Sequence, residues 1–168
     1  DSWAIKTAMP TARWGLGIGV VNDKIYAIGG LSGTKNEEYD PATDSWAIKA
    51  SLPTNRSGFG IGTVNNKIYV IGGYAVSTGA MSINEEYDPM ADTWATKASM
   101  PTKREQFVIG VVNNKIYAIG GGETAGSLVG QPTLPPPVGL LVYGTGAPPP
   151  RGVADRERGL RGEPGMVS

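Results

Sequence analysis

The chain has 168 residues, with 15 basic and 15 acidic side chains, and so carries no formal net charge at neutral pH. This balance gives no electrostatic reason to expect binding to nucleic acid or to an anionic membrane. The absence of cysteine and histidine removes thiol and disulfide chemistry, the commonest metal ligand and the commonest general base. No apolar run approaches the ~18 residues of a membrane helix. From its length we expect one domain. From its composition we expect no cofactor, no bound metal and no membrane-inserted segment.

Residues 1–10 are the first element, and they belong to a repeat. Their sequence DSWAIKTAMP returns at 44–53 as DSWAIKASLP and at 92–101 as DTWATKASMP. Each copy is predicted to form an outer strand followed by a connection into the next unit. Because the first copy has no unit of its own before it, we assign it to a preceding or closing unit. The simplest interpretation is that the preceding unit was cut away.

The next element alternates glycine with mostly apolar residues, first at 15–20 and again at 58–63. Alternation with a period of two predicts a strand, and glycine within a strand indicates close approach by another backbone. The same letters loosely match a phosphate-binding loop, but such a loop leads from a strand into a helix. Here another strand pattern follows, so we reject a phosphate site.

The strongest pattern comes next and occurs three times, as NDKIYAIGG at 22–30, NNKIYVIGG at 65–73 and NNKIYAIGG at 113–121. Each copy joins a turn pair, a lysine, a short apolar run and a double glycine, which predicts a strand with a turn at each end. The first interval is 43 residues and the second is 48. The five additional residues fall in the spacer 74–84, so an insertion lengthened one loop while the strands kept their pattern.

Two further features recur behind the double glycine, namely a Tyr-Asp-Pro turn and then a tryptophan. The residues concerned are Gly29, Gly30, Tyr39 and Trp46 in the first unit, Gly72, Gly73, Tyr87 and Trp94 in the second, and Gly120 and Gly121 in the third. This series resembles the kelch repeat, and the resemblance covers residues 1–122. It implies that each unit is a four-stranded blade of a β-propeller.

We therefore predict an all-β fold, a partial kelch-type β-propeller. Two complete four-stranded blades are expected at 11–50 and 51–98, and part of a third at 99–122. The resemblance makes residues 1–10 the outer strand of a preceding or closing blade.

Residues 123–168 differ sharply in composition from the repeats. Eight of the 13 prolines lie in 131–168, and the segment after 151 is charged and poor in apolar residues. We expect a disordered Pro/Gly-rich tail. The period places a third Tyr-Asp-Pro near residue 135, where consecutive prolines stand, and GLLVY at 139–143 is at most a weak substitute strand. The break equally suits a genuine linker and a frameshifted, fused or mispredicted gene end.

Two pairs of adjacent glutamates, Glu37 with Glu38 and Glu85 with Glu86, invite an acid–base interpretation. Neighbouring residues of a strand point to opposite faces, so the members of a pair cannot share one site. We expect an outer strand with one solvated carboxylate in each pair.

Candidate binding residues come from the starts of the inner strands. Three arginines recur there, either to bind anions at a channel mouth or to tie neighbouring blades through backbone carbonyls. Their identical repetition favours the structural role. Function is expected where the repeats differ, which is directly after each arginine and in the long spacer. The candidate rim therefore consists of Trp14, Ser57, Glu105, Arg13, Arg56, Arg104 and Tyr74.

From the resemblance and this rim we predict a binding module, not an enzyme, which presents inter-blade loops to a protein or carbohydrate partner. We expect it to be a fragment of a larger propeller, and so few blades also favour self-association to complete one. Among kelch-type enzymes, a copper oxidase needs histidine and cysteine, which this sequence lacks. The alternatives left open are a fragment of a sugar-acid epimerase and a truncated product without independent function.

Overall fold

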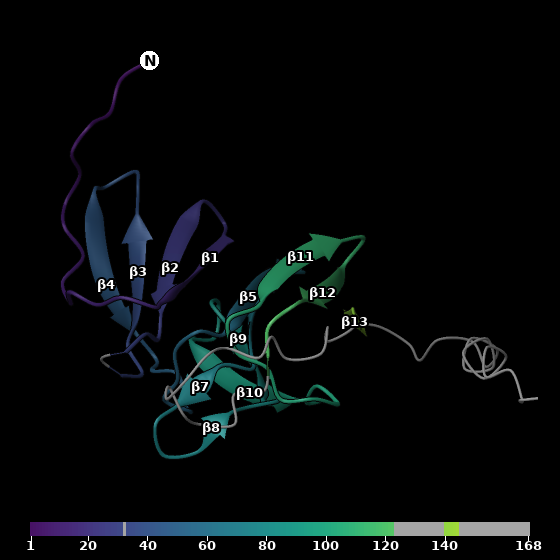
Figure 1. Cartoon of the computed structure of the whole chain (residues 1–168). Helices are drawn as coiled ribbons and strands as arrows, with labels where there is room; N and C mark the ends of the chain where they lie inside the picture. Colours follow the sequence, from purple (N-terminus) through teal and green to yellow (C-terminus); the bar gives the residue numbers. More distant parts are fainter. Residues whose placement is uncertain (32, 123–139, 145–168) are drawn as a thin grey trace, which may run out of the picture.

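The computed structural model describes residues 1–31, 33–122 and 140–144. The regular elements in this part of the chain are all β-strands (Figure 1), which confirms the predicted all-β fold. The described residues include no helix long and apolar enough to cross a membrane. The expected disorder of the tail concerns residues 123–139 and 145–168, which lie outside the described part of the chain.

The strands form three main antiparallel sheets, which we call blades 1, 2 and 3. Blade 1 runs in the order β1 (Gly17–Val21), β2 (Lys24–Ile28), β3 (Asn36–Asp40) and β4 (Ser45–Lys49). Blade 2 runs in the order β5 (Gly60–Val64), β6 (Lys67–Ile71), β9 (Asn84–Asp88) and β10 (Thr93–Lys97). Blade 3 contains β11 (Val108–Val112), β12 (Lys115–Ile119) and β13 (Leu141–Gly144), and a separate hairpin is made of β7 (Tyr74–Ala75) and β8 (Gly79–Ala80).

Each blade begins with a hairpin whose turn is two residues long. The turn residues are Asn22 and Asp23, Asn65 and Asn66, and Asn113 and Asn114, all with φ between 49° and 60°. Tight two-residue turns of this kind need positive φ at both positions, which asparagine and aspartate tolerate better than most residues. The repeated turn signals therefore fix the register in which β1 pairs with β2, β5 with β6 and β11 with β12.

The blades pack against one another, and a glycine of one blade receives the side chains of the next. A Cβ at Gly60 of β5 would lie 2.4 Å from Ile109 and 2.7 Å from the ring of Phe107. These contacts leave no space for a side chain, so blades 2 and 3 approach closely at this point. The same relation holds between blades 1 and 2, where Gly17 lies against Phe59.

Two hydrophobic clusters fill the contacts between the blades. The first joins blades 1 and 2 and consists of Val21, Tyr26, Ile28, Leu52, Ile68, Val70 and Tyr87. The second joins blades 2 and 3 and consists of Val64, Tyr69, Ile71, Phe107, Ile116 and Ala118. Strand β6 contributes to both clusters, which explains why its sequence is a nearly continuous apolar run.

Blade 3 has a third strand that the sequence pattern barely indicates. Strand β13 pairs with β12 and places Tyr143 opposite Ile116. Tyr39 and Tyr87 have the same register position in blades 1 and 2. The weak substitute strand is therefore present, and the predicted low-complexity tail does not extend over Leu141–Gly144.

Residues 1–10 contain no strand, although their sequence repeats that of a strand. Trp3 and Ile5 are fully exposed, at 103% and 101%. The predicted outer strand is not formed in the single chain, because residues 1–6 pair with none of the described strands and a strand needs such a neighbour for its backbone groups. In Figure 1 the purple trace runs beside β4, and its N-terminal end extends beyond blade 1.

Candidate functional site

A buried arginine lies just before the first strand of blade 1 and of blade 2, and a glutamate of the same blade forms an ion pair with it. Arg13 forms an ion pair with Glu37 of β3 and donates to a backbone carbonyl of β2 at 2.7 Å. Arg56 forms the matching pair with Glu85 of β9 and donates to a carbonyl of β6 at 2.9 Å. The guanidinium groups therefore join the strands of one blade. The expectation that they tie neighbouring blades is wrong for these two arginines.

Hydrogen bonds stabilise the charged forms of these side chains and offset the free-energy cost of burying a charge. Burial alone would raise the pKa of Glu37, but hydrogen bonds from Thr11 and Arg13 outweigh it and lower the pKa. Burial lowers the pKa of the Arg56 guanidinium, and the nearby Glu85 carboxylate opposes this change. An arginine remains charged at neutral pH, so each pair is an ion pair inside the blade.

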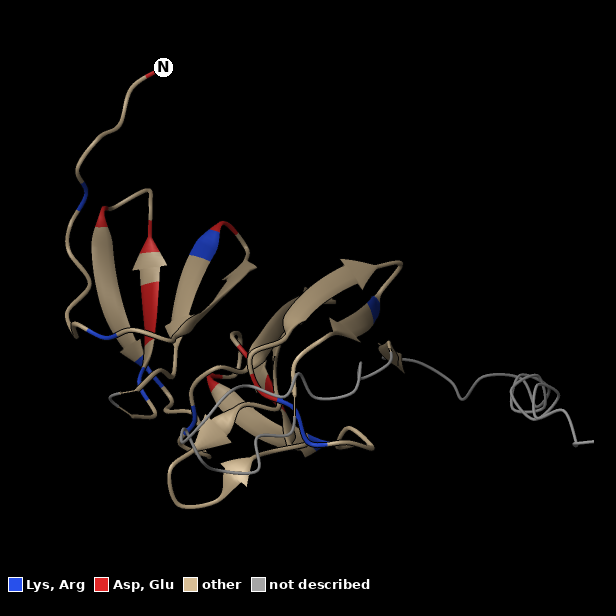
Figure 2. Cartoon of the chain, viewed as in Figure 1, with Lys and Arg blue, Asp and Glu red and all other residues tan. Residues whose placement is uncertain are grey.

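The second glutamate of each adjacent pair is also largely withdrawn from water. Glu38 accepts from Lys24 at 3.0 Å and from Tyr26 at 2.7 Å, and Lys49 lies 3.3 Å away. Its side chain is 9% exposed, and that of Glu86 is 15% exposed. Figure 2 shows the acidic residues of β3 beside the basic start of β2. The expectation of one solvated carboxylate per pair is wrong, because the entry loop covers Glu37 on one face of β3, and two lysines and a tyrosine cover Glu38 on the other.

Blade 3 keeps the arginine but not the glutamate. Leu141 of β13 has the register position of Glu37 and Glu85. Arg104 is 1% exposed and donates to the carbonyl of Gly120 at 2.9 Å. All three arginine side chains of the predicted rim thus lie inside the protein, and only their backbone is available to the rim.

The residue after each arginine pairs, through its backbone, with the residue after the double glycine. Ser57 and Tyr74 exchange two hydrogen bonds of 2.8 and 3.0 Å, and Glu105 pairs with Gly122 in the same way. In blade 1 the carbonyl of Trp14 accepts the corresponding bond at 3.0 Å. The variable positions therefore lie at equivalent points, each at the junction between the entry loop of a blade and the end of its second strand.

Backbone contacts also link these junctions from blade to blade. A Cβ at Gly15 would lie 3.5 Å from the Cβ of Ser57, and the amide of Gln106 donates to the carbonyl of Gly58 at 2.8 Å. The loops that carry the three variable positions thus follow one another along one edge of the blade array.

The variable side chains differ in what they offer to solvent. Trp14 is 68% exposed, Ser57 is partly buried and Glu105 is 8% exposed. Burial raises the pKa of Glu105. Trp14 and Ser57 remain accessible, whereas the carboxylate expected from Glu105 is largely covered.

A hollow of about 330 Å³ opens beside Ser57, between blades 1 and 2. Its wall consists of Gly30 and Leu31 from blade 1, residues 55–57, and residues 74–77 from the long spacer. That spacer folds into the β7–β8 hairpin. Val76 in this hairpin is 90% exposed and Leu31 is 52% exposed, so the hollow combines apolar side chains with serine and tyrosine hydroxyl groups.

Comparison with known proteins identifies the fold family. Two stretches, residues 13–53 and 55–101, match the sequence model of the kelch motif and together cover more than half of the chain. The chain belongs to the kelch-repeat family. A solved structure titled "Structure of YjhT" matches with a TM-score of 0.63 and 23% sequence identity, over 70% of this chain and 37% of that chain. At this identity the likeness concerns the fold, and no match was found among curated proteins.

The kelch tyrosine and tryptophan form, with an aspartate, a clip that holds the outer strand. In blade 2, Trp94 packs on Tyr87 with ring centroids 4.9 Å apart and donates from its indole nitrogen to the carbonyl of Ala50 at 2.8 Å. Asp92 accepts from the Tyr87 hydroxyl at 2.6 Å and from the Ala50 amide at 2.8 Å. The clip therefore fastens the outer strand to the connection that precedes the blade.

Blade 1 repeats this clip with Tyr39, Trp46, Asp44 and Thr7. Its ring centroids are 5.0 Å apart, and the hydrogen bond to Asp44 raises the pKa of Tyr39 to about 12. Thr7 has the position that Ala50 has in blade 2. The connection after residues 1–6 is therefore hydrogen-bonded to blade 1, whereas residues 1–6 form no strand.

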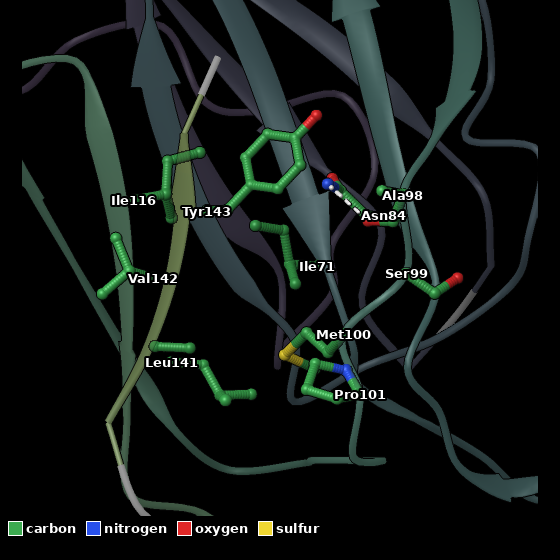
Figure 3. A pocket seen from close by; sticks show the side chains of 11 residues that line it. Ile71, Asn84, Ala98, Ser99, Met100, Pro101, Ile116, Leu141, Val142 and Tyr143 are labelled. Carbon is green, nitrogen blue, oxygen red and sulfur yellow. Dashed lines mark hydrogen bonds between the residues drawn. The ribbon is translucent and has the colours of Figure 1, made fainter. Parts of the chain in front are cut away.

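Blade 3 has the tyrosine of the clip, but no tryptophan of the described residues lies against it. Tyr143 lies 5.7 Å from Tyr69 between ring centroids, as Tyr87 does from Tyr26. A cavity of about 140 Å³ remains between blade 2 and β13. In Figure 3 the side chains of β13 line one side of it and residues 98–101 line the other.

Sequence reasoning missed the buried ion pairs, Leu31 as a partner in the hollow, and the role of Tyr143. A signal for the ion pairs exists, because arginine and glutamate recur with one period in the first two kelch units. Among the described residues, no group of three or more aspartates and glutamates is arranged to hold a metal ion.

Proposed function

We propose that this kelch chain is a binding module and that the hollow beside Ser57 receives an apolar side chain of a protein partner. The observation that carries the proposal is the β7–β8 hairpin, which forms one wall of the hollow and has no counterpart in the shorter spacer of blade 1. Repeated residues hold the repeats together, so an element that is present in blade 2 and missing from the described spacer of blade 1 is the better candidate for recognition.

The hairpin is held in position before any partner arrives. Its start is fixed by the paired backbone of Ser57 and Tyr74, and its end by the Met81 amide, which donates to Gly73 at 2.8 Å. The carbonyl of Met81 in turn accepts from the Arg104 amide at 2.9 Å. A preformed wall lowers the conformational entropy that binding would cost, which favours a role as a recognition surface.

The chemistry of the hollow favours a peptide segment over a sugar. Its volume is near the lower end for small-molecule sites, which span about 300–1,000 Å³, and it suits one large side chain. Exposed Leu31 and Val76 offer apolar contact, and the exposed Trp14 that could stack on a sugar ring is outside the lining. The carboxylates of Glu37, Glu38 and Glu85 are engaged by arginine, threonine, tyrosine or lysine within the blades, so they lend no support to an acid–base enzyme.

The test is selection of peptides against the full chain from a random displayed library, followed by affinity measurements on variants. Val76→Asp should weaken the selected peptides at least about tenfold, because it places an unpaired charge in the apolar contact. Met90→Asp is the matched control, since Met90 is 91% exposed in a turn outside the hollow. Equal loss in both variants, or no selection of peptides, would remove the proposal. Binding to a glycan array that depends on Trp14 would overturn the protein class of the partner.

A further inference from the structure

In the described part of the chain, two segments lack the partner that their repeats possess. Residues 1–6 read DSWAIK, identical to 44–49, of which 45–49 form the outer strand β4. Strand β13 is the last strand of blade 3 in the described structure, at the position of β3 and β9, which both carry an outer strand. We propose that residues 1–6 of a second copy of this chain add to β13 as the fourth strand of blade 3.

The repeats define the register of this addition. In blade 1, Trp46 lies opposite Tyr39, and the next pair joins a small residue of β4 to Glu38. Transferred to blade 3, Trp3 lies opposite Tyr143 and Ala4 lies opposite Val142. Backbone pairing of this kind supplies affinity along the whole strand, while the side chains select the register.

The receiving side of the clip is already formed. Trp94 in blade 2 packs on Tyr87, and blade 3 presents Tyr143 in the same place, with its ring against Tyr69 as Tyr87 packs on Tyr26. The cavity of about 140 Å³ opens directly beside Tyr143 (Figure 3). An indole placed there from Trp3 restores the aromatic pair of the complete blades.

The carbonyl that the indole needs also lies in this cavity. The carbonyl of Ala50 accepts from both Asn36, at 3.2 Å, and Trp94, at 2.8 Å. Its counterpart Ala98 accepts from Asn84 at 3.3 Å and lines the cavity. The second acceptor position of Ala98 is thus the one that the Trp3 nitrogen would take.

The surfaces next to these elements are open at both ends of the blade array. Val112 and Ile119 of blade 3 are 56% and 48% exposed. The equivalent residues of blade 2, Val64 and Ile71, are only 3% and 2% exposed. On blade 1, Ile18 is 49% exposed. A second copy whose first strands follow its residues 1–6 onto blade 3 would cover both surfaces.

The contact between blades depends on a glycine that faces a phenylalanine. A Cβ at Gly17 would lie 2.6 Å from the ring of Phe59, and one at Gly60 would lie 2.7 Å from the ring of Phe107. Within one chain, therefore, each phenylalanine requires a glycine on the blade before it.

At the two ends of the array, the glycine is replaced by a larger residue and the phenylalanine by a smaller one. Blade 3 has Val108 in the place of the glycine, and blade 1 has Leu16 in the place of the phenylalanine. Valine adds three carbons that glycine lacks, and leucine lacks the three outermost carbons of the phenylalanine ring. A contact between blade 3 of one copy and blade 1 of another brings these residues together and conserves volume, which packed interfaces tolerate best.

Geometry also limits how many copies can close a ring. The described residues of each copy form three blades, and propellers close with about four to eight. Two copies joined head to tail supply six blades, with residues 1–6 of each copy completing blade 3 of the other. The assembly is therefore expected to be a closed dimer, and it does not depend on the peptide site proposed above.

The decisive experiment is disulfide trapping between single-cysteine variants of the full chain, which has no native cysteine. Ala4→Cys and Val142→Cys place their thiols directly opposite each other in the proposed register, within the range that a disulfide bridges. Mixed under mild oxidation, the two variants should form a covalent heterodimer in high yield. The matched control replaces Val142→Cys with Leu141→Cys, whose side chain points to the other face of β13 and should not be trapped.

Light scattering on the unmodified chain and on Trp3→Ala completes the test. The chain should have twice the mass of one copy, and Trp3→Ala should weaken the dimer at least about tenfold. Because Trp3 is fully exposed in the single chain, this substitution leaves the fold of one copy unchanged, and Val76→Ala serves as the control for losing an exposed apolar side chain. A monomeric chain, no covalent heterodimer of Ala4→Cys with Val142→Cys, or equal trapping of the Leu141→Cys control would each overturn the inference.

Discussion

The buried arginine–glutamate pairs show how a blade holds charge in its interior. Glu85 accepts from Arg56 and, at 2.8 Å, from the hydroxyl of Thr54, whose carbonyl accepts from Arg56 at 3.0 Å. The pair is thus enclosed by its own hydrogen bonds. Because water is excluded, either charge left alone would lack the partner that compensates its burial.

We predict that Glu85→Leu, which gives blade 2 the residue of blade 3, lowers the free energy of unfolding by about 3–5 kcal/mol. The physical reason is the buried guanidinium that loses its counter-charge. The double variant Arg56→Met/Glu85→Leu should recover part of this loss, because it removes both charges. Lys97→Met breaks the partly exposed pair with Glu86, 34% and 15% exposed, and should cost about 0–1 kcal/mol. Urea denaturation measures all three variants, and a Glu85→Leu loss no larger than that of Lys97→Met would refute the assignment.

The lowered pKa of Glu37 predicts a specific dependence of stability on pH. Its folded-state pKa lies below the unfolded value of about 4.3, so its contribution is present above the unfolded pKa and lost as pH falls through the folded pKa. Glu37→Gln should therefore be less stable than the native chain at pH 7, and the difference should shrink towards pH 2–3. Denaturant titrations at several pH values measure this slope. The control is Glu105→Gln, whose difference should change with the opposite sign, since burial raises the pKa of Glu105.

At the scale of the strands, the close contact between blades makes substitution of Gly60 destabilising. The missing Cβ would lie 2.4 Å from Ile109, so Gly60→Ala should lower the free energy of unfolding by about 1–3 kcal/mol through overpacking. Gly110→Ala is the matched control in blade 3, because a Cβ there meets nothing within 4 Å. Thermal unfolding of dilute samples compares the two. Equal destabilisation by both would mean that strand propensity, and not the contact between blades, decides the cost.

Periodicity predicted the inner strands well and the outer elements poorly, for physical reasons. The hairpins at 17–28, 60–71 and 108–119 form where a turn signal and an alternating pattern coincide. The register of β13 is instead set by packing of Tyr143 against Tyr69, a contact between residues far apart in the sequence that a local pattern cannot show. The hairpin β7–β8 likewise depends on the long-range pair of Ser57 and Tyr74.

The glutamates illustrate the same limit for the candidate site. The rule that neighbours on a strand point to opposite faces holds for Glu37 and Glu38, which meet Arg13 and Tyr26 respectively. The inference that one of them is solvated failed because it treated the third strand as an edge. In this blade, lysine and tyrosine side chains cover one face of β3 and the entry loop covers the other, so residue order alone does not give burial.

The whole molecule is an array whose two ends expose the surfaces that its middle buries. Tyr69, Ile71 and Val64 of blade 2 lie inside a contact, whereas the equivalent strands of blade 3 expose Val112 and Ile119. Removing these apolar surfaces from water would contribute roughly 25 cal/mol for each Å² buried. The stability of the array should therefore depend on whether copies are available to cover its ends.

This dependence predicts that the thermal midpoint of the full chain rises with protein concentration. An assembly that binds only folded copies stabilises them by mass action, so raising the concentration over two orders of magnitude should move the midpoint upward by several degrees. Trp3→Ala should flatten this dependence and leave the dilute midpoint unchanged, because the Trp3 side chain is fully exposed in the single chain. Differential scanning calorimetry at matched scan rates gives both curves. A native midpoint that is independent of concentration, with a sharp and reversible transition of a single copy, would show that three blades are stable alone and that the exposed ends need no cover.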